Sequence, residues 1–321
     1  MRCLVTGGAG FIGSHLTEAL LRCGDSVCVI DDLSTGSRSN IQPFLQVPGY
    51  DFVEGSILDS PELERLIASS DCIFHLAAAV GVELVVHDPV RTILTNVSGS
   101  ERVLALASRY KKRCILASTS EVYGKSSKSA FSETDDLLIG PPTHSRWSYA
   151  CSKLLDEFLL MAYCRDRGLP GTAVRFFNTV GPRQTGRYGM VIPRFVSAAL
   201  TGKPLQVYGT GEQTRCFCHV SDVVRALLLL RGNPASIGEV FNIGSSEIVS
   251  IRALAEFVIA RTHSTSGIEV VSYDKAYANG FEDMLHRAPD CSKIAALCGW
   301  KAELPLGRII DDVADFERKR L

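Results

Sequence analysis

The segment TGGAGFIG, residues 6–13, restricts the possible folds of this chain more than any other feature. It follows an apolar run typical of a buried strand, and it opens a helical pattern that continues to Cys23. Gly7, Gly10 and Gly13 have the spacing GxxGxxG, which lets the backbone turn tightly and approach a pyrophosphate at the helix N-terminus. A glycine-rich turn without a ligand is the alternative, but the position between strand and helix favours a dinucleotide site.

The rest of the first half alternates between strand and helix patterns. Strands are predicted at residues 3–7, 26–31, 51–55, 72–78, 113–118 and 172–177, and helices at 12–23, 60–70, 89–110 and 148–167. This alternation predicts an α/β fold with a Rossmann-type, doubly wound parallel sheet and helices on both faces. We expect residues 1–177 to form a dinucleotide-binding domain and residues 178–321 a smaller substrate lobe, with the chain re-entering the sheet around 216–243.

An acid at the end of the second predicted strand indicates which dinucleotide is bound. Asp31 would accept hydrogen bonds from the adenosine ribose and repel a 2′-phosphate, so NAD is expected rather than NADP, although Arg38 lies nearby. The predicted cofactor-binding residues come from the glycine loop, the following strand ends and two helices. They are Gly7, Gly10, Phe11, Ile12, Gly13, Asp31, Asp32, Ser56, Ile57, Leu76, Ala77, Ala78, Asn96, Tyr149 and Lys153.

The composition argues against several classes of partner. Lysine and arginine number 34 and aspartate and glutamate 35, so no nucleic acid is expected. The apolar stretches are too short to span a bilayer, and Met1-Arg2 leads directly into a strand, which predicts a cytoplasmic protein without signal peptide or membrane contact. The 11 scattered cysteines fit reduced thiols. Cys216, Cys218 and His219 resemble metal ligands, but without a second Cys/His pair we predict no metal site.

Two further segments contain candidate catalytic groups. Tyr149 and Lys153 lie four residues apart, on one face of a predicted helix. The ammonium, together with the positive nicotinamide ring, is expected to lower the pKa of the phenol toward neutrality, so that Tyr149 can take a proton from an alcohol. STSEVYG, residues 118–124, follows an apolar strand whose end should face a ligand. Thr119, Ser120 and Glu121 are therefore predicted to join the pair.

With these motifs the chain resembles the extended short-chain dehydrogenases/reductases that act on nucleotide sugars. The resemblance covers nearly the whole chain and rests on VTGGAGFIGSHL, HLAA, STSEVYG, YxxxK, RFFNTVGPR, VYGTGEQTR, HVSDV and NIGS. It implies NAD in the N-terminal lobe, a UDP- or dTDP-sugar in the C-terminal lobe, and a homodimer formed through the helices near 89–110 and 148–167. The substrate-binding residues that it implies are Asn178, Arg183, Val191, Gln213, Arg215 and Arg287. Ser56 departs from the family, which often has an acid there.

Two positions resemble one branch of this family, the UDP-glucuronate decarboxylases. Glu121 lacks the preceding aspartate of the dehydratases, and Arg287-Ala-Pro-Asp is similar to the Arg-Lys-Pro-Asp of the decarboxylases. The resemblance implies NAD-dependent decarboxylation of UDP-glucuronic acid through a 4-keto intermediate, giving UDP-xylose or a released UDP-4-keto-pentose. Thr119 would bind the C4 oxygen, and Glu121 and Arg287 would act near the carboxylate. A UDP-glucuronate 4-epimerase is the alternative enzyme, and a non-catalytic NAD-binding sensor or scaffold is the alternative from another class.

Overall fold

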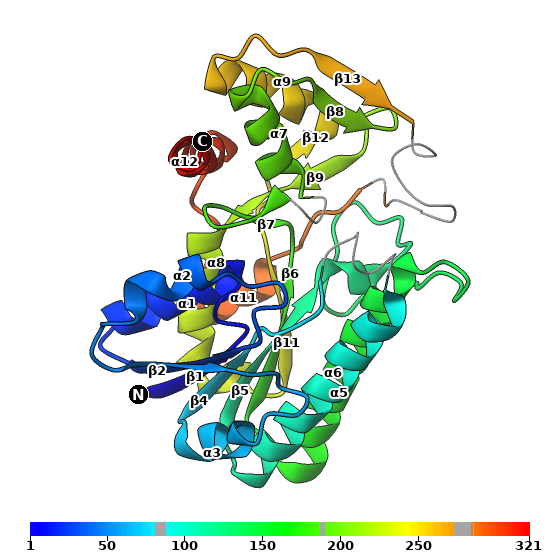
Figure 1. The fold of residues 1–321 in the computed structure, drawn as a ribbon. Helices are drawn as coiled ribbons and strands as arrows, with labels where there is room; N and C mark the ends of the chain where they lie inside the picture. The colour runs from blue at the N-terminus through cyan, green and yellow to red at the C-terminus, as the bar shows by residue number, and fades with distance from the viewer. Residues whose placement is uncertain (81–87, 187–189, 273–283, 285) are drawn as a thin grey trace.

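The computed structural model describes residues 1–80, 88–186, 190–272, 284 and 286–321, and its centre is a seven-stranded parallel sheet (Figure 1). The chain adds strands first toward one edge and then toward the other, so the carboxyl ends of β1 and β4 form the switch point where such sheets bind ligands. This arrangement confirms the predicted Rossmann-type sheet. From edge to edge the strands are β11 (Glu239–Ile243), β6 (Gly171–Phe176), β5 (Arg113–Thr119), β4 (Cys72–His75), β1 (Arg2–Thr6), β2 (Ser26–Asp31) and β3 (Tyr50–Glu54).

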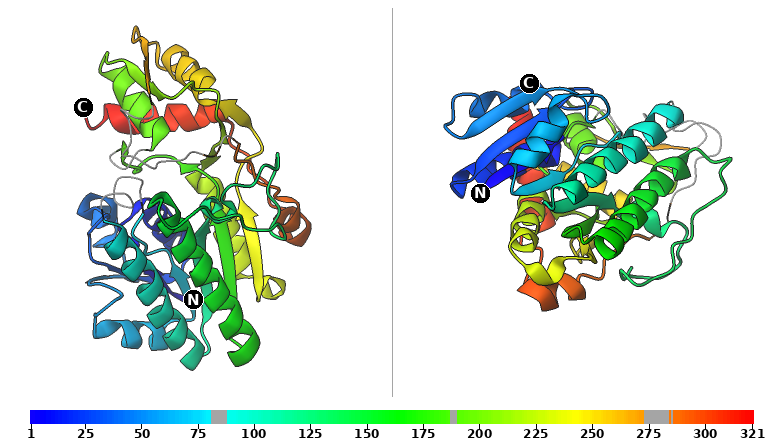
Figure 2. Two further views of the ribbon diagram at one scale, coloured as in Figure 1. Left: turned by 90° about the vertical axis from the view of Figure 1, so that its right-hand side faces the viewer. Right: turned by 90° about the horizontal axis from the view of Figure 1, so that it is seen from below.

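Helices cover both faces of the sheet because its strands are apolar on both sides. Alternate residues of β1 enter different cores: Cys3 and Val5 pack on one side and Leu4 on the other. The first side is covered by α1 (Phe11–Arg22) and α8 (Val220–Arg231). The second side is covered by α3 (Glu62–Ser69), α5 (Pro89–Arg109) and α6 (Arg146–Arg167), and the latter two pack along each other (Figures 1 and 2).

Short elements follow two strand ends. After β2 come α2 (Arg38–Ile41) and the 3-10 turn η1 (Gln42–Phe44), and after β5 comes the 3-10 turn η2 (Ser120–Tyr123). The Thr119 side chain accepts a hydrogen bond from the Glu121 backbone at 3.2 Å and thereby starts η2. The segment around Glu121 is therefore a tight turn at the carboxyl end of a central strand.

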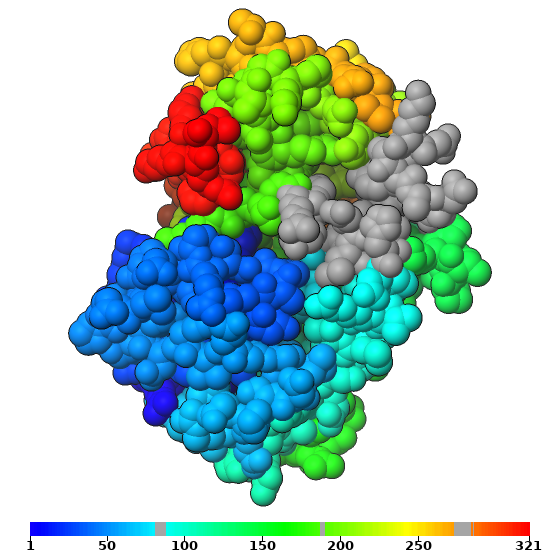
Figure 3. All heavy atoms as spheres, viewed as in Figure 1, coloured from blue at the N-terminus to red at the C-terminus, as the bar shows by residue number. Residues whose placement is uncertain are grey.

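A second, smaller core forms the C-terminal lobe, which lies above the sheet in Figure 1 and makes up the upper part of the molecule in Figure 3. It is built from α7 (Val191–Leu200), α9 (Ile251–Thr262) and α12 (Leu306–Arg318), packed against the parallel pair β8 (Leu205–Tyr208) and β13 (Ile268–Val271). Two more strand pairs join the parts: β7 (Thr179–Val180) with β10 (Cys218–His219), and β9 (Thr214–Cys216) with β12 (Ile248–Ser250).

The chain returns from this lobe to the sheet in two places. The first return contains α8, the 3-10 turn η4 (Pro234–Ser236) and β11. The second contains α11 (Ser292–Cys298), where Ile294 and the nearby Trp300 enter the core beside α8. The boundary proposed from the sequence does not include this second return, because an apolar helix of seven residues has no signal that assigns it to one core. Within the described ranges, no helix combines the length and the apolar character needed to cross a membrane.

Candidate active site

A cavity of about 1200 Å³ lies at the carboxyl ends of the central strands and is lined by both parts of the chain. The sheet side contributes the glycine loop, the ends of β2, β4 and β5, and the start of α6, while the other side contributes α7 and β8. Every predicted site residue except Asn96 lines this one cavity. The fold therefore brings together residues that are up to 280 positions apart in the sequence, from Gly7 to Arg287.

The loop between β1 and α1 has the shape that a pyrophosphate requires. Gly7 has a φ of +73°, and a Cβ atom there would lie 2.8 Å from the Ala77 backbone. A Cβ atom on Gly13 would collide with the Gly7 carbonyl oxygen. Gly10 precedes the first turn of α1 and has no side chain that could cap this helix. The N–H groups of the first turn therefore can donate to a phosphate.

Asp31 lines the cavity at the end of β2, and two backbone hydrogen bonds hold its side chain. The N–H groups of Ala9 and Leu33 donate to its two carboxylate oxygens at 2.9 and 2.8 Å. Burial raises the pKa of this carboxyl, and the two backbone hydrogen bonds act against that shift. Arg38, a possible receptor for a 2′-phosphate, is paired with Glu54 instead. The residues at this end of the cavity thus fit NAD.

Asn96 has a supporting position behind the cavity wall. Its side-chain oxygen accepts from the Ala79 N–H at 2.8 Å, and its amide donates to the Ser152 hydroxyl at 3.0 Å. A direct contact between Asn96 and the cofactor therefore stays a prediction. Asn96 ties the segment after β4 to α6, next to Lys153.

Tyr149 and Lys153 face the cavity from the first two turns of α6, and Thr119 is hydrogen-bonded to Tyr149. The pKa of Tyr149 is raised, first by burial and then by the negative charges of Glu121 and Asp156. Lys153 donates to Asp156 at 2.7 Å. The chain's own charges thus act opposite to the lowering predicted from the YxxxK spacing, since the ammonium already has an anionic partner. The expected lowering of the Tyr149 pKa also relied on the positive nicotinamide ring, which belongs to the cofactor and not to the protein.

Glu121 is bound by two arginines from distant parts of the sequence. Arg146 Nη2 lies 3.1 Å from its Oε2 atom, and Arg287 Nη1 pairs with its Oε1 atom. Burial alone would raise the pKa of this carboxyl, but the charges of Arg146 and Arg287 outweigh it and lower the pKa to about 2. Glu121 is therefore ionised at every ordinary pH.

Asn178 connects this cluster to the C-terminal lobe. Its amide donates to the Cys216 carbonyl oxygen at 2.8 Å, and its side-chain oxygen accepts from Arg287 Nη2 at 2.5 Å. Gln213 and Arg215 follow on the same side, both largely buried. Val191, at the start of α7, and Ser120, in η2, complete the predicted lining.

Arg183 lies toward the other end of the cavity. Its Nη2 atom pairs with Glu18 of α1 at 2.5 Å, and its guanidinium lies 5.9 Å from the centre of the Phe44 ring. A substrate contact for Arg183 therefore stays a prediction, and the contacts that the structure gives it are with α1 and η1.

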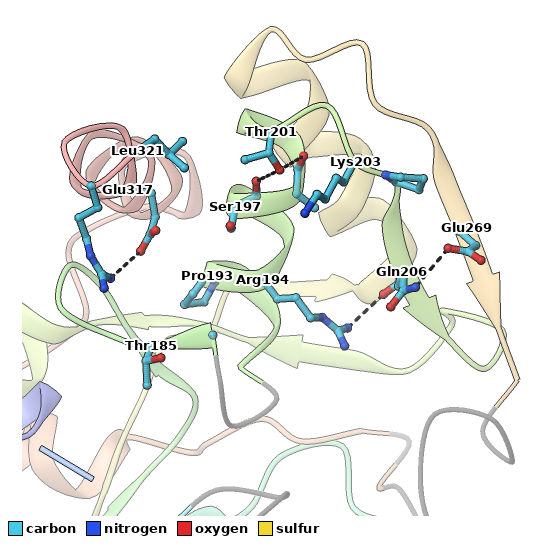
Figure 4. Close-up of a pocket in the computed structure, with 14 residues that line it drawn as sticks. Thr185, Pro193, Arg194, Ser197, Thr201, Lys203, Gln206, Glu269, Glu317 and Leu321 are labelled. Atoms are coloured by element: carbon cyan, nitrogen blue, oxygen red, sulfur yellow. Dashed lines mark hydrogen bonds and ion pairs between the residues drawn. The ribbon is translucent and has the colours of Figure 1, made fainter.

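A smaller hollow of about 710 Å³ adjoins the cavity on the C-terminal lobe (Figure 4). Arg194 binds the Gln206 carbonyl oxygen at 3.0 Å, and its guanidinium stacks 4.0 Å from the centre of the Tyr208 ring. Arg194 and Tyr208 thus form a stacked wall where the hollow and the cavity meet. The residues common to both are Thr185, Pro193, Arg194 and Arg320.

Two residues of the site were not found by sequence reasoning. Arg146 stands three positions before Tyr149, and Asp156 three positions after Lys153, so both share the inward face of α6 with the pair. That spacing was a usable signal. It was weak, because charged residues at such positions in a helix more often face solvent.

Comparisons with known proteins test the family resemblance that the motifs indicate. The profile of the "NAD dependent epimerase/dehydratase family" matches residues 3–244. A UDP-N-acetyl-alpha-D-glucosaminuronate decarboxylase of Bacillus cytotoxicus is 44% identical over 92% of this chain and 91% of its own. UDP-glucuronic acid decarboxylase 6 of Arabidopsis thaliana is 35% identical over 95% of this chain and 85% of its own.

The structure is also similar to that of UDP-glucuronic acid 4-epimerase from Bacillus cereus, solved in complex with UDP-glucuronic acid and NAD. The TM-score is 0.89 and the identity 29%, over 100% of both chains. Sequence profile, relatives and fold thus agree with the resemblance that the motifs indicate. The chain belongs to the NAD-dependent epimerase/dehydratase family.

Proposed function

We propose that this protein is an NAD-dependent decarboxylase of UDP-hexuronic acids, which converts UDP-glucuronic acid through a 4-keto intermediate into UDP-xylose. The observation that carries the proposal is the position of Glu121 between Arg146 and Arg287, on the same cavity as Tyr149. Two guanidinium groups at one point can receive the carboxylate that distinguishes a uronic acid from other sugars. The relatives that are named as decarboxylases support the same assignment.

The first step is oxidation at C4 of the sugar. The glycine loop and Asp31 would hold NAD, which would supply the hydride acceptor for this oxidation. Tyr149 takes the proton of the C4 hydroxyl group, and Thr119, its hydrogen-bond partner, holds the C4 oxygen. Both groups stand on rigid elements, Thr119 at the end of β5 and Tyr149 in α6, so their geometry is set before substrate binds.

The second step is the loss of carbon dioxide. A ketone at C4 is β to the C6 carboxylate, so the bond between C5 and C6 can break with its electrons passing into the ketone as an enolate, and C5 is then protonated. Arg146 and Arg287 hold the carboxylate in this scheme. Glu121 competes with it for the same donors, because it stays ionised at neutral pH. The substrate carboxylate is thus bound without being strongly stabilised in its charged form, which favours its release as neutral carbon dioxide.

The C-terminal lobe would hold the nucleotide. We assign Asn178, Val191, Gln213 and Arg215 to this role because they line the cavity on that side. Arg215 brings a guanidinium, which suits a diphosphate. The proposed division is residues 1–177, with the returns at 216–243 and at α11, for NAD and the rest of residues 178–321 for the UDP-sugar.

A second substrate and a second reaction are defined alternatives. The relative at 44% identity is named for the 2-acetamido sugar, so UDP-N-acetylglucosaminuronate is the second candidate substrate. A 4-epimerase is the second candidate reaction, given the similarity to the B. cereus enzyme. An epimerase must keep its keto intermediate from losing carbon dioxide, and an anion such as Glu121 beside the carboxylate works against that.

Release of carbon dioxide is the deciding measurement. Purified protein should release it from C6-labelled UDP-glucuronic acid or UDP-N-acetylglucosaminuronate, and chromatography should show the matching UDP-pentose. The ratio of the two rates identifies the C2 substituent that the site accepts. UDP-galacturonate without carbon dioxide would instead identify an epimerase, and no turnover with NAD bound would favour the sensor or scaffold.

We also propose a homodimer formed through α5 and α6. These helices lie side by side in Figures 1 and 2 and expose Leu94, Leu155 and Phe158, which are 56%, 50% and 65% exposed. Two such faces would form a four-helix bundle and cover the patch. Replacing Leu155 and Phe158 together by Asp should give a monomer in analytical ultracentrifugation. The control Phe257→Asp, at an exposed residue of α9, should leave a dimer. A wild-type monomer would contradict the proposal.

The proposed location is the cytoplasm. All 11 cysteines are free thiols, and Cys3, Cys28, Cys72 and Cys114 are buried in strands of the sheet. Burial raises the pKa of Cys28 to about 11 and that of Cys114 to about 12, so these thiols stay protonated and unreactive. A reducing compartment suits such a chain.

A further inference from the structure

The ammonium of Lys153 forms a buried ion pair with a residue one turn further along α6. Its Nζ atom donates to Asp156 Oδ2 at 2.7 Å, and the two side chains are only 3% and 1% exposed. In this low-dielectric environment the pair acts on Tyr149 as a dipole, not as a single positive charge. The YxxxK motif accounts for Tyr149 and Lys153 but not for Asp156.

Neutral groups of α5 and β4 enclose this ion pair. Ser100 of α5 hydrogen-bonds Asp156, and the hydroxyl oxygen of Ser100 lies 3.1 Å from His75 Nε2. The other ring nitrogen of His75 lies 2.8 Å from the Thr6 hydroxyl, just before the glycine loop. Burial and the charge of Lys153 lower the pKa of His75 to about 3, so the imidazole is neutral. Burial raises the pKa of Asp156, while Lys153 and Ser100 act against that shift.

Tyr149 faces charged groups from two elements. On α6 these are Lys153 and Asp156, which pair with each other. From η2 it is Glu121, and the carboxylate of Glu121 is itself bound by Arg146 and Arg287. Burial is the largest cause of the raised pKa of Tyr149, followed by Glu121 and then Asp156. The balance of these groups leaves the phenol protonated at neutral pH.

We propose that Asp156 is a positioning residue that keeps Tyr149 protonated unless a further positive charge enters the cavity. The oxidised nicotinamide ring carries such a charge, and the reduced ring does not. The inference rests on the proposed function, in which C4 loses a hydride and the hydroxyl proton and later regains both. With Asp156 present, Tyr149 accepts the proton beside the oxidised cofactor and holds it, ready to be returned, beside the reduced one. Asp156 thus favours completion of the cycle over release of the 4-keto sugar.

The direct test measures the phenol at position 149 without cofactor or substrate. A fluorinated tyrosine at that position, with a more acidic phenol, is titrated by ¹⁹F NMR in full-length, cofactor-free protein. Asp156→Asn removes the charge but keeps the shape, and the midpoint should fall by about one pH unit. Glu157→Gln is the matched control, because Glu157 is the adjacent buried acid but pairs with Arg175. That midpoint should not move. An unchanged midpoint in Asp156→Asn overturns the proposal.

The catalytic consequence is measured separately. In Asp156→Asn the pH profile of NADH formation should shift to lower pH, and the share of product released as 4-keto sugar should rise several-fold, while Asp156→Glu should restore the wild-type profile. A shifted midpoint with an unchanged product ratio overturns the role in closing the cycle. If no variant, nor the wild type, releases carbon dioxide, the proposed function fails, whereas the NMR titration still decides the effect of Asp156. Should Asp156→Asn not fold, Asp156→Ser is equally neutral and leaves room for water around Lys153.

Discussion

Tyr149→Phe is expected to abolish oxidation of the sugar while the protein keeps its fold and its NAD. The change removes only the phenol oxygen, and the ring that fills the start of α6 remains. Without that oxygen the C4 hydroxyl group has no base, and a loss of about 10³-fold in NADH formation is expected. The measurement is NADH absorbance in a single turnover with UDP-glucuronic acid, together with the NAD content of the purified variant.

A second tyrosine of the same helix gives the matched control. Tyr163 lies in the last two turns of α6 and stacks with Arg167, away from the cavity lining. Tyr163→Phe should form NADH at the wild-type rate. If Tyr149→Phe does so as well, the base lies elsewhere and the assignment of the pair fails.

Much of the fold follows from local patterns, because a parallel sheet gives strong ones. The strands are apolar on both faces, and some helices end at a residue that the sequence makes visible, such as Gly168 after α6. The short elements were not predicted. α2 has four residues and α11 has seven, which is too few for a helical period to stand out. Their positions are decided by tertiary contacts, for α11 the burial of Ile294.

The site shows a similar division. Residues in contiguous motifs, such as the glycine loop and Thr119 to Glu121, could be located from the sequence because the motif itself positions them. Ion pairs between distant residues could not. Glu121 and Arg287 were both predicted, but the distance of 166 positions gives no sign that they bind each other. The pKa of Tyr149 is raised first by burial, then by Glu121 and then by Asp156, and the inward orientation of Asp156 is a property of the packed helix.

Glu121 should matter after hydride transfer, not before it. Its carboxylate sits between two arginines, whereas Tyr149 and Thr119, which are hydrogen-bonded to each other, are the groups proposed to hold the C4 oxygen. Ser120 beside it is neutral, which fits a reaction that removes no water from C5 and C6 and needs no second acid. Because the pKa of Glu121 is lowered to about 2, its charge does not change across the working pH range. Any effect of its removal is therefore an effect of a permanent charge.

Glu121→Ala is accordingly expected to separate oxidation from decarboxylation. Tyr149, Lys153 and Thr119 remain, so NADH should still form from UDP-glucuronic acid. Carbon dioxide release should slow by about 10²-fold or more, since both guanidinium groups now stabilise the substrate carboxylate. Glu121→Gln should behave like the alanine variant if charge is the cause.

The experiment is a single turnover in which NADH absorbance and trapped carbon dioxide are followed on the same sample. Arg287→Ala serves as the comparison, and it should weaken substrate binding at the start, because it removes a charge partner of the carboxylate. NADH should therefore appear later in Arg287→Ala, and carbon dioxide later in Glu121→Ala. Carbon dioxide at the wild-type rate in Glu121→Ala would show that this carboxylate has no part in the loss of C6, and that its two arginines bind the substrate without it.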